Sequence, residues 1–88
     1  MRVAIVGSRQ CRNISIADII RFIPSNCSEI ISGGAEGIDS LAAKAATKLG
    51  LRLTEFLPDY TVFGKSAPIV RNMQIVKNCD YLLAFWDY

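Results

Sequence analysis

Short apolar runs alternate along this sequence with longer segments in which apolar residues recur every three or four positions. The apolar runs at residues 3–6, 29–31, 51–57 and 81–86 predict four β-strands, and the segments between them predict three helices. Strands that alternate with helices of this length imply a parallel sheet with right-handed crossovers, for which we expect the strand order 3-2-1-4. The sequence therefore predicts an α/β protein with a small Rossmann-like, three-layer fold, in which a parallel sheet of about four strands is flanked by three helices.

Each predicted helix has an apolar stripe and a residue that begins or ends it. Ser15 and Asp18 resemble a capping box at the start of the first helix, and Pro24 ends that helix. Gly50 is the expected stop of the second helix, and Pro68 opens the third. The apolar stripes are Ile16, Ile19, Ile20 and Ile23 in the first helix, Ile38, Leu41, Ala42, Ala45 and Leu49 in the second, and Ile69, Met73 and Val76 in the third.

The strand patterns predict where each strand lies in the sheet. The aliphatic run at 3–6 is typical of a central strand that is buried on both faces, whereas the alternation at 51–57 suits an edge strand. Residues 58–65 predict a loop that is long for a unit of this size, and such loops often carry function. The run at 81–86 is too apolar to remain a bare edge, so we expect homo-oligomers formed through this strand or the helices beside it.

Length and charge narrow the function classes. The chain has 88 residues, of which 51% are hydrophobic, and we expect a single domain over residues 1–88. Its formal net charge is only +2, so it lacks the strong positive field of a general DNA- or RNA-binding domain. We therefore do not expect nucleic acid as a partner, while a small anion site remains compatible with this charge.

Several signals of other protein classes are missing from the sequence. The apolar runs are shorter than the roughly 20 residues of a membrane span, and the N-terminus shows no cleavage pattern, so we expect a cytoplasmic protein that does not bind membranes. Cys11, Cys27 and Cys79 lack metal-binding spacing, and there is no histidine. They predict free thiols, and we expect neither a disulfide nor a metal site.

The strongest candidate for a functional site is the loop at residues 32–39, which reads Ser-Gly-Gly-Ala-Glu-Gly-Ile-Asp and joins a strand to a helix. A helix start has unpaired N–H groups and a partial positive charge, so it is suited to a phosphate. We expect the N–H groups of residues 34–37 to hold such an anion. The loop matches neither G-x-G-x-x-G nor the P-loop pattern, so glycines that only form a tight turn are the alternative.

Two further segments should reach the same edge of the sheet. Residues 7–9 and the turn after Trp86 follow the first and fourth strands, whose carboxyl ends flank the point where the strand order reverses. Ser8 and Arg9 are therefore candidates for an anion-binding hydroxyl and guanidinium. A solvated loop is the alternative for these two residues.

Of three more polar residues, Asp39 has two interpretations, and Arg71 and Asn72 have an unusual position in their helix. Asp39 either caps the second helix through backbone N–H groups or accepts hydrogen bonds from a ligand hydroxyl. Arg71 and Asn72 fall at the start of the third helix, where an arginine is unfavourable for the helix dipole. This position favours a ligand or a buried partner for Arg71.

Four segments together resemble a known family. They are Gly-Ser-Arg at 7–9, the glycine loop at 32–39, Gly-Lys-Ser-Ala-Pro-Ile-Val-Arg-Asn at 64–72 and Asp-Tyr-Leu-Leu-Ala-Phe-Trp-Asp at 80–87. This combination resembles the YspA and YpsA-related branch of the SLOG superfamily, whose members are Rossmann-like. It is also similar to the DNA-processing protein DprA and to the Lonely Guy phosphoribohydrolases.

The resemblance implies a module that binds a nucleotide or a nucleotide derivative and acts as a sensor or accessory domain. In the family, the glycine loop is implicated in holding such a ligand. The ligand-binding residues implied here are Gly7, Ser8, Arg9, Gly33, Gly34, Ala35, Glu36, Gly37, Asp39, Arg71 and Asn72. No other cofactor is implied.

Two other functions follow from the same resemblance. A Lonely Guy enzyme hydrolyses an N-glycosidic bond and uses a second glycine loop, Pro-Gly-Gly-x-Gly-Thr, that this sequence lacks. Glu36 or Asp39 would have to serve as the acid, so we lean against an enzyme. A DprA-like protein would bind single-stranded DNA, for which Tyr60, Phe63 and Trp86 could supply stacking surfaces.

Overall fold

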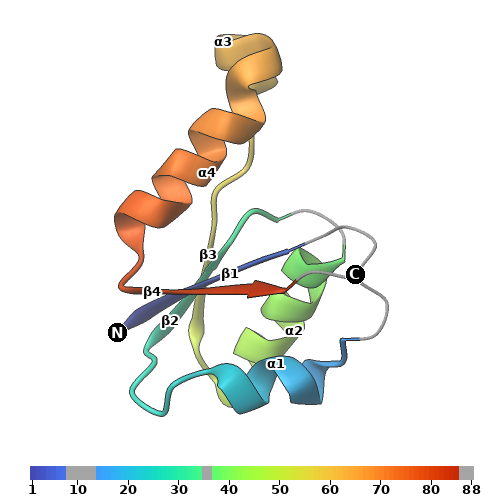
Figure 1. Cartoon of the computed structure of the whole chain (residues 1–88), viewed down its shortest axis with the longest axis vertical. Helices are drawn as coiled ribbons and strands as arrows, with labels where there is room; N and C mark the ends of the chain where they lie inside the picture. Colours follow the sequence, from blue (N-terminus) through green and yellow to red (C-terminus); the bar gives the residue numbers. More distant parts are fainter. Residues whose placement is uncertain (8–13, 35–36, 86–88) are drawn as a thin grey trace.

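The computed structural model describes residues 1–7, 14–34 and 37–85 of the chain. Four strands form one parallel sheet in the order β3-β2-β1-β4, which confirms the predicted topology (Figure 1). The strands are β1 (Arg2–Gly7), β2 (Glu29–Ser32), β3 (Arg52–Glu55) and β4 (Tyr81–Phe85). The main helices are α1 (Ile16–Phe22), α2 (Ile38–Leu49) and α4 (Ala67–Asn78).

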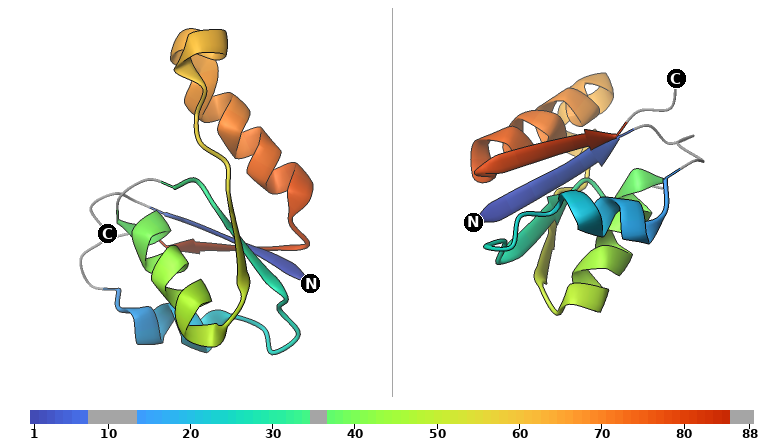
Figure 2. Two further views of the ribbon diagram at one scale, coloured as in Figure 1. Left: turned by 180° about the vertical axis from the view of Figure 1, so that it is seen from behind. Right: turned by 60° about the horizontal axis from the view of Figure 1, so that its bottom comes forward.

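The sheet lies between two helical layers, as Figure 2 shows in its right-hand view. Alternate residues of β1 point to opposite faces, as in any strand. Val3 and Ile5 pack with Ile19 of α1 and with the buried alanines of α2, whereas Ala4 packs with Ile75 of α4 on the other face. All three β1 residues are fully buried, so β1 is the central strand that the sequence predicts.

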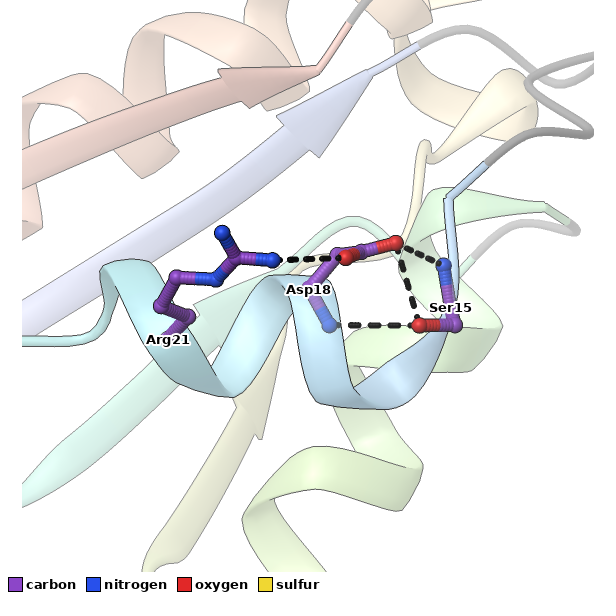
Figure 3. Close-up of polar contacts among 3 residues, drawn as sticks. All are labelled: Ser15, Asp18 and Arg21. Atoms are coloured by element: carbon purple, nitrogen blue, oxygen red, sulfur yellow. Dashed lines mark hydrogen bonds and ion pairs between the residues drawn. The ribbon is translucent and has the colours of Figure 1, made fainter.

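The start of α1 has the predicted capping box, shown in Figure 3. The backbone N–H of Asp18 donates to the Ser15 hydroxyl at 3.2 Å, and the backbone N–H of Ser15 donates to the Asp18 carboxylate at 3.0 Å. Arg21 lies one turn further and forms an ion pair of 3.3 Å with the same carboxylate. The hydrogen bonds from Ser15, and to a lesser extent Arg21, hold the pKa of Asp18 below its ordinary value.

The segment before α4 differs from the prediction. Where we expect a loop, the chain forms a short helix, α3 (Tyr60–Phe63), and a 3-10 turn, η1 (Gly64–Ser66). The Asp59 carboxylate caps α3 by accepting a hydrogen bond from the N–H of Val62 at 3.2 Å. Local capping of this kind is a weak signal in a sequence, because Asp also favours turns.

The predicted apolar stripe of α4 does not face the core. Ile69, Met73 and Val76 have exposed fractions of 65%, 66% and 60%, whereas Ala67 and Ile75 are buried. The stripe therefore forms an exposed apolar surface. Within the part of the chain that the structure describes, no helix is long and apolar enough to cross a membrane.

Candidate ligand-binding site

A pocket of about 290 Å³ lies beside the carboxyl end of β1, between the sheet and α4. It combines residues from two strands, from the loop after β2, from the first turn of α2 and from α4. The lining residues are Val6, Gly7, Gly33, Asp39, Arg71, Asn72, Ile75, Val76 and Leu82. Five predicted site residues are thus brought together: Gly7, Gly33, Asp39, Arg71 and Asn72. Whether they bind a ligand stays a prediction.

Arg71 connects α4 to the glycine loop. Its Nη1 donates a hydrogen bond to the carbonyl oxygen of Gly33 at 3.1 Å, and its Nε donates to the side-chain oxygen of Asn72 at 2.8 Å. Since α4 begins at Ala67, Arg71 lies just beyond the first helical turn. The unfavourable interaction of its charge with the helix dipole is therefore weaker than the sequence suggests. In the structure Arg71 therefore has a partner within the protein, the backbone carbonyl of Gly33.

Gly33 is needed for the close approach of this arginine. It is buried, and its φ does not lie in the left-handed region, so the backbone itself does not require a glycine. A Cβ at Gly33 would overlap the guanidinium of Arg71 and would lie 3.1 Å from a carboxylate oxygen of Asp39. The absence of a side chain at Gly33 therefore makes room for both charged groups.

Gly34 and Gly37 have a different role, because both have a positive φ, of 69° and 76°. A Cβ on Gly34 would meet the side chains of Glu55 and Leu57 at the edge of the sheet, and Gly34 does not line the pocket. Its N–H donates to the Ser32 hydroxyl at 3.4 Å. Both glycines therefore have a backbone conformation that an L side chain rarely adopts, as a tight turn requires, whereas binding of an anion by this loop stays a prediction.

Asp39 is not the cap residue of α2. The N-cap is Gly37, two positions earlier, so Asp39 lies in the first turn of the helix, where a carboxylate interacts favourably with the dipole. The side chain is half-buried and lines the pocket. Its predicted contact with a ligand hydroxyl stays a prediction.

Several predicted site residues lie outside the described part of the chain. These residues are Ser8, Arg9, Ala35 and Glu36. The stacking candidate Trp86 also lies outside the described part. The expected binding of an anion by the N–H groups of residues 34–37 involves some of these residues, and it also stays a prediction.

The apolar part of the pocket lining could not be recognised in the sequence. Ile75, Val76 and Leu82 form this part, and Asp39 and Arg71 supply the charged groups. Val76 belongs to the predicted stripe of α4 and Leu82 to the apolar fourth strand, but the periodicity alone assigns both to a core. The pocket is therefore lined by both charged and apolar side chains.

The parallel sheet and the pocket at its carboxyl edge define a Rossmann-like α/β protein with a site of small-molecule size. Residues 1–72 match the family described as DNA recombination-mediator protein A, and the chain belongs to this family. The matched region includes the glycine loop and ends at Asn72. The match supports the resemblance to DprA, whereas the relation to YspA and YpsA stays a prediction. No curated protein and no solved structure matches the chain.

Proposed function

We propose that the pocket binds a nucleotide and holds its phosphate at Arg71. The observation that supports this most directly is the hydrogen bond from Arg71 to Gly33, which holds the guanidinium in the pocket at the carboxyl edge of the sheet. A guanidinium has five N–H donors in a planar fork that matches phosphate oxygens. The bonds to Gly33 and Asn72 use only two of its nitrogen atoms, so the same group can also bind a phosphate.

The other pocket residues suit the rest of a nucleotide. The apolar side chains of Ile75, Val76 and Leu82 can contact the base or the sugar, and the Asp39 carboxylate can accept a hydrogen bond from a sugar hydroxyl. A volume of about 290 Å³ is close to the lower limit for small-molecule sites, so it suits a single nucleotide unit. These properties support a binding module that acts as a sensor or accessory domain.

The family match favours a second candidate function, the binding of single-stranded DNA. The family is described as a DNA recombination mediator, and a nucleotide unit in the pocket can equally be one link of a DNA strand. A strand would place further phosphates and bases outside the pocket. The two candidates therefore differ in how affinity depends on ligand length.

The test is a titration of the 88-residue chain with thymidine monophosphate and with an oligothymidylate of about eight nucleotides. We expect Arg71→Ala to weaken binding of both ligands by roughly 10- to 100-fold, because a hydrogen bond to a charged group contributes about 1.5–3 kcal/mol. Arg52→Ala is the matched control, since Arg52 is exposed on β3 and does not line the pocket. Equal affinity of the Arg71→Ala variant and the unmodified chain would disprove the proposal.

Ligand length separates the two candidates. Similar affinities for the monophosphate and the oligonucleotide would identify a nucleotide-binding module. A much tighter complex with the oligonucleotide, with a strong dependence on salt, would identify single-stranded DNA as the ligand.

A further inference from the structure

The pocket contains two charged side chains of opposite sign. Among the described residues that line it, Arg71 and Asp39 are the charged ones, and both are half-buried. A Cβ on Gly33 would lie 2.9 Å from Cζ of Arg71 and 3.1 Å from a carboxylate oxygen of Asp39. These two atoms are therefore at most about 6 Å apart, the sum of the two distances. One cation and one anion give the described lining of the pocket no net charge.

The two charges act in opposite directions on a bound phosphate. Arg71 attracts each negative charge of the ligand, and Asp39 repels it. Salt screens half-buried charges less than fully exposed ones, so both interactions persist in ordinary buffers. The first negative charge of a phosphate gains strong hydrogen bonds from the guanidinium. A second negative charge gains little further attraction, while it raises the cost of removing the ligand from water.

The number of charges on a phosphate depends on how it is linked. A phosphate at the end of a molecule is a monoester, and it carries about −1.5 to −2 charges at pH 7 because its second pKa is about 6. A phosphodiester joins two groups and carries a single negative charge. The charge of the phosphate therefore distinguishes these two classes of ligand.

We infer that Asp39 determines which class of phosphate the pocket accepts, because it cancels the attraction of Arg71 for a second negative charge. With Asp39 present, the pocket accepts a singly charged phosphodiester at least as well as a terminal phosphate. Arg71 without this carboxylate would favour the terminal phosphate. This inference rests on the proposed binding of a phosphate at Arg71, and it makes Asp39 a specificity-determining residue of that site.

The test compares thymidine monophosphate with its phosphate methyl ester, which carries one charge less, by calorimetric titration at about pH 7.5. For the unmodified chain we expect the methyl ester to bind at least as tightly as the monophosphate. Asp39→Asn replaces the carboxylate by a neutral amide of the same size, and the ratio of the two affinities should shift toward the monophosphate by about 3- to 100-fold. This range corresponds to one unit charge at about 6 Å in effective dielectric constants of about 80 to 20. A lost contact with the sugar changes both affinities alike and cancels in the ratio.

Asp59→Asn is the matched control, because it removes a carboxylate in the same way at a residue that does not line the pocket. Asp59 caps α3, which lies at the end of α4 furthest from the sheet (Figure 1). Asparagine caps a helix about as well as aspartate, so the control variant should keep its fold. We expect no change in its affinity ratio. An equal shift in both variants would come from the overall charge of the protein and would overturn the role of Asp39.

A second measurement uses the unmodified chain alone, so it does not depend on the folding of a variant. The sequence has no histidine, so lowering the pH from about 7.5 to about 5.5 acts chiefly on the ligand and converts much of the monophosphate to its singly charged form. The affinity of the monophosphate relative to the methyl ester should stay the same or rise. A fall of about twofold or more would show that the pocket favours the doubly charged form, which is the opposite of what we infer.

The outcomes separate the specificity of Asp39 from the proposed function. Binding of both ligands that is lost in Arg71→Ala, together with an unchanged ratio in Asp39→Asn, would retain the phosphate site and overturn the role of Asp39. A clear preference of the unmodified chain for the monophosphate would have the same meaning. Failure of both ligands to bind the unmodified chain would overturn the phosphate site and the role of Asp39 together.

Discussion

Gly33 and Gly34 are adjacent in the glycine loop and have different physical roles. Gly33 has no special backbone conformation and makes room for Arg71 and Asp39, whereas Gly34 has a φ of 69° and forms the turn. The sequence predicts correctly that this loop needs glycines, but it leaves open which requirement applies at each position. The answer depends on a side chain that is far away in the sequence and reaches the loop only in the folded protein.

This difference leads to a prediction for Gly33→Ala. The new methyl group would overlap the end of the flexible Arg71 side chain, so the guanidinium should move out of its position while the fold is retained. We expect nucleotide affinity to fall about as much as in Arg71→Ala, with a change in unfolding free energy of less than about 1 kcal/mol. Calorimetric titration and chemical denaturation measure the two effects.

Gly34→Ala is the matched control for this prediction. It forces an L side chain into a left-handed conformation, which costs roughly 1 kcal/mol or more in stability. Gly34 does not line the pocket, so the folded variant should still bind the nucleotide. If Gly33→Ala binds as tightly as the unmodified chain, the position of Arg71 is unimportant for the ligand.

At the scale of the element, α4 shows that the spacing of apolar residues predicts a helix correctly but not the face of it that is buried. The buried or half-buried positions Ala67, Arg71 and Ile75 are four residues apart and form one stripe. An arginine lies in the middle of this stripe because the Gly33 carbonyl accepts its hydrogen bond. A search for apolar spacing selects Ile69, Met73 and Val76 instead, since hydrophobicity alone gives no sign of a half-buried cation.

The capping box of α1 predicts a pH dependence. The native fold lowers the pKa of Asp18 through the hydrogen bonds from Ser15, so the ionised carboxylate stabilises the folded state. This contribution is complete above the ordinary carboxylate pKa and is lost as the pH falls through the lowered value. We therefore expect Asp18→Asn to be less stable than the unmodified chain at pH 7, with a difference that disappears in strong acid.

Urea denaturation across this pH range measures the effect, and Ser15→Ala provides a second variant. It removes the hydroxyl that bonds to Asp18 without removing the carboxylate, and should destabilise the protein by about 1 kcal/mol at pH 7. Its stability difference should also shrink in acid. A difference that stays constant over the whole pH range in both variants would show that the capping box does not depend on the charge of Asp18.

At the scale of the whole molecule, the strand order could be predicted because few topologies are compatible with alternating strands and helices. Right-handed crossovers and the apolar run at residues 3–6 of β1 leave the order 3-2-1-4 as the simplest arrangement. The same topology brings Gly7, Gly33 and Leu82 to one pocket. The apolar part of the pocket lining could not be predicted, because Val76 and Leu82 have the same pattern as core residues.

The sheet also predicts self-association of the chain. β4 lies at one edge of the sheet, and its Tyr81 and Leu82 side chains are exposed. An exposed apolar edge strand presents unpaired N–H and C=O groups to a second copy, which can extend the sheet across a two-fold axis. We expect a dimer that dissociates on dilution, and sedimentation velocity over a range of concentrations measures it.

Ala84→Lys tests which edge carries the contact. Ala84 is exposed on β4, so the monomer should accommodate a lysine there. In the dimer the substitution would place two like charges near each other across the two-fold axis. We therefore expect the dimer to weaken at least tenfold. Leu53→Lys makes the same type of change on β3, at the opposite edge, and should leave the dimer intact. A chain that stays monomeric at high micromolar concentration would contradict the prediction. Dissociation by Leu53→Lys alone would instead place the contact at β3.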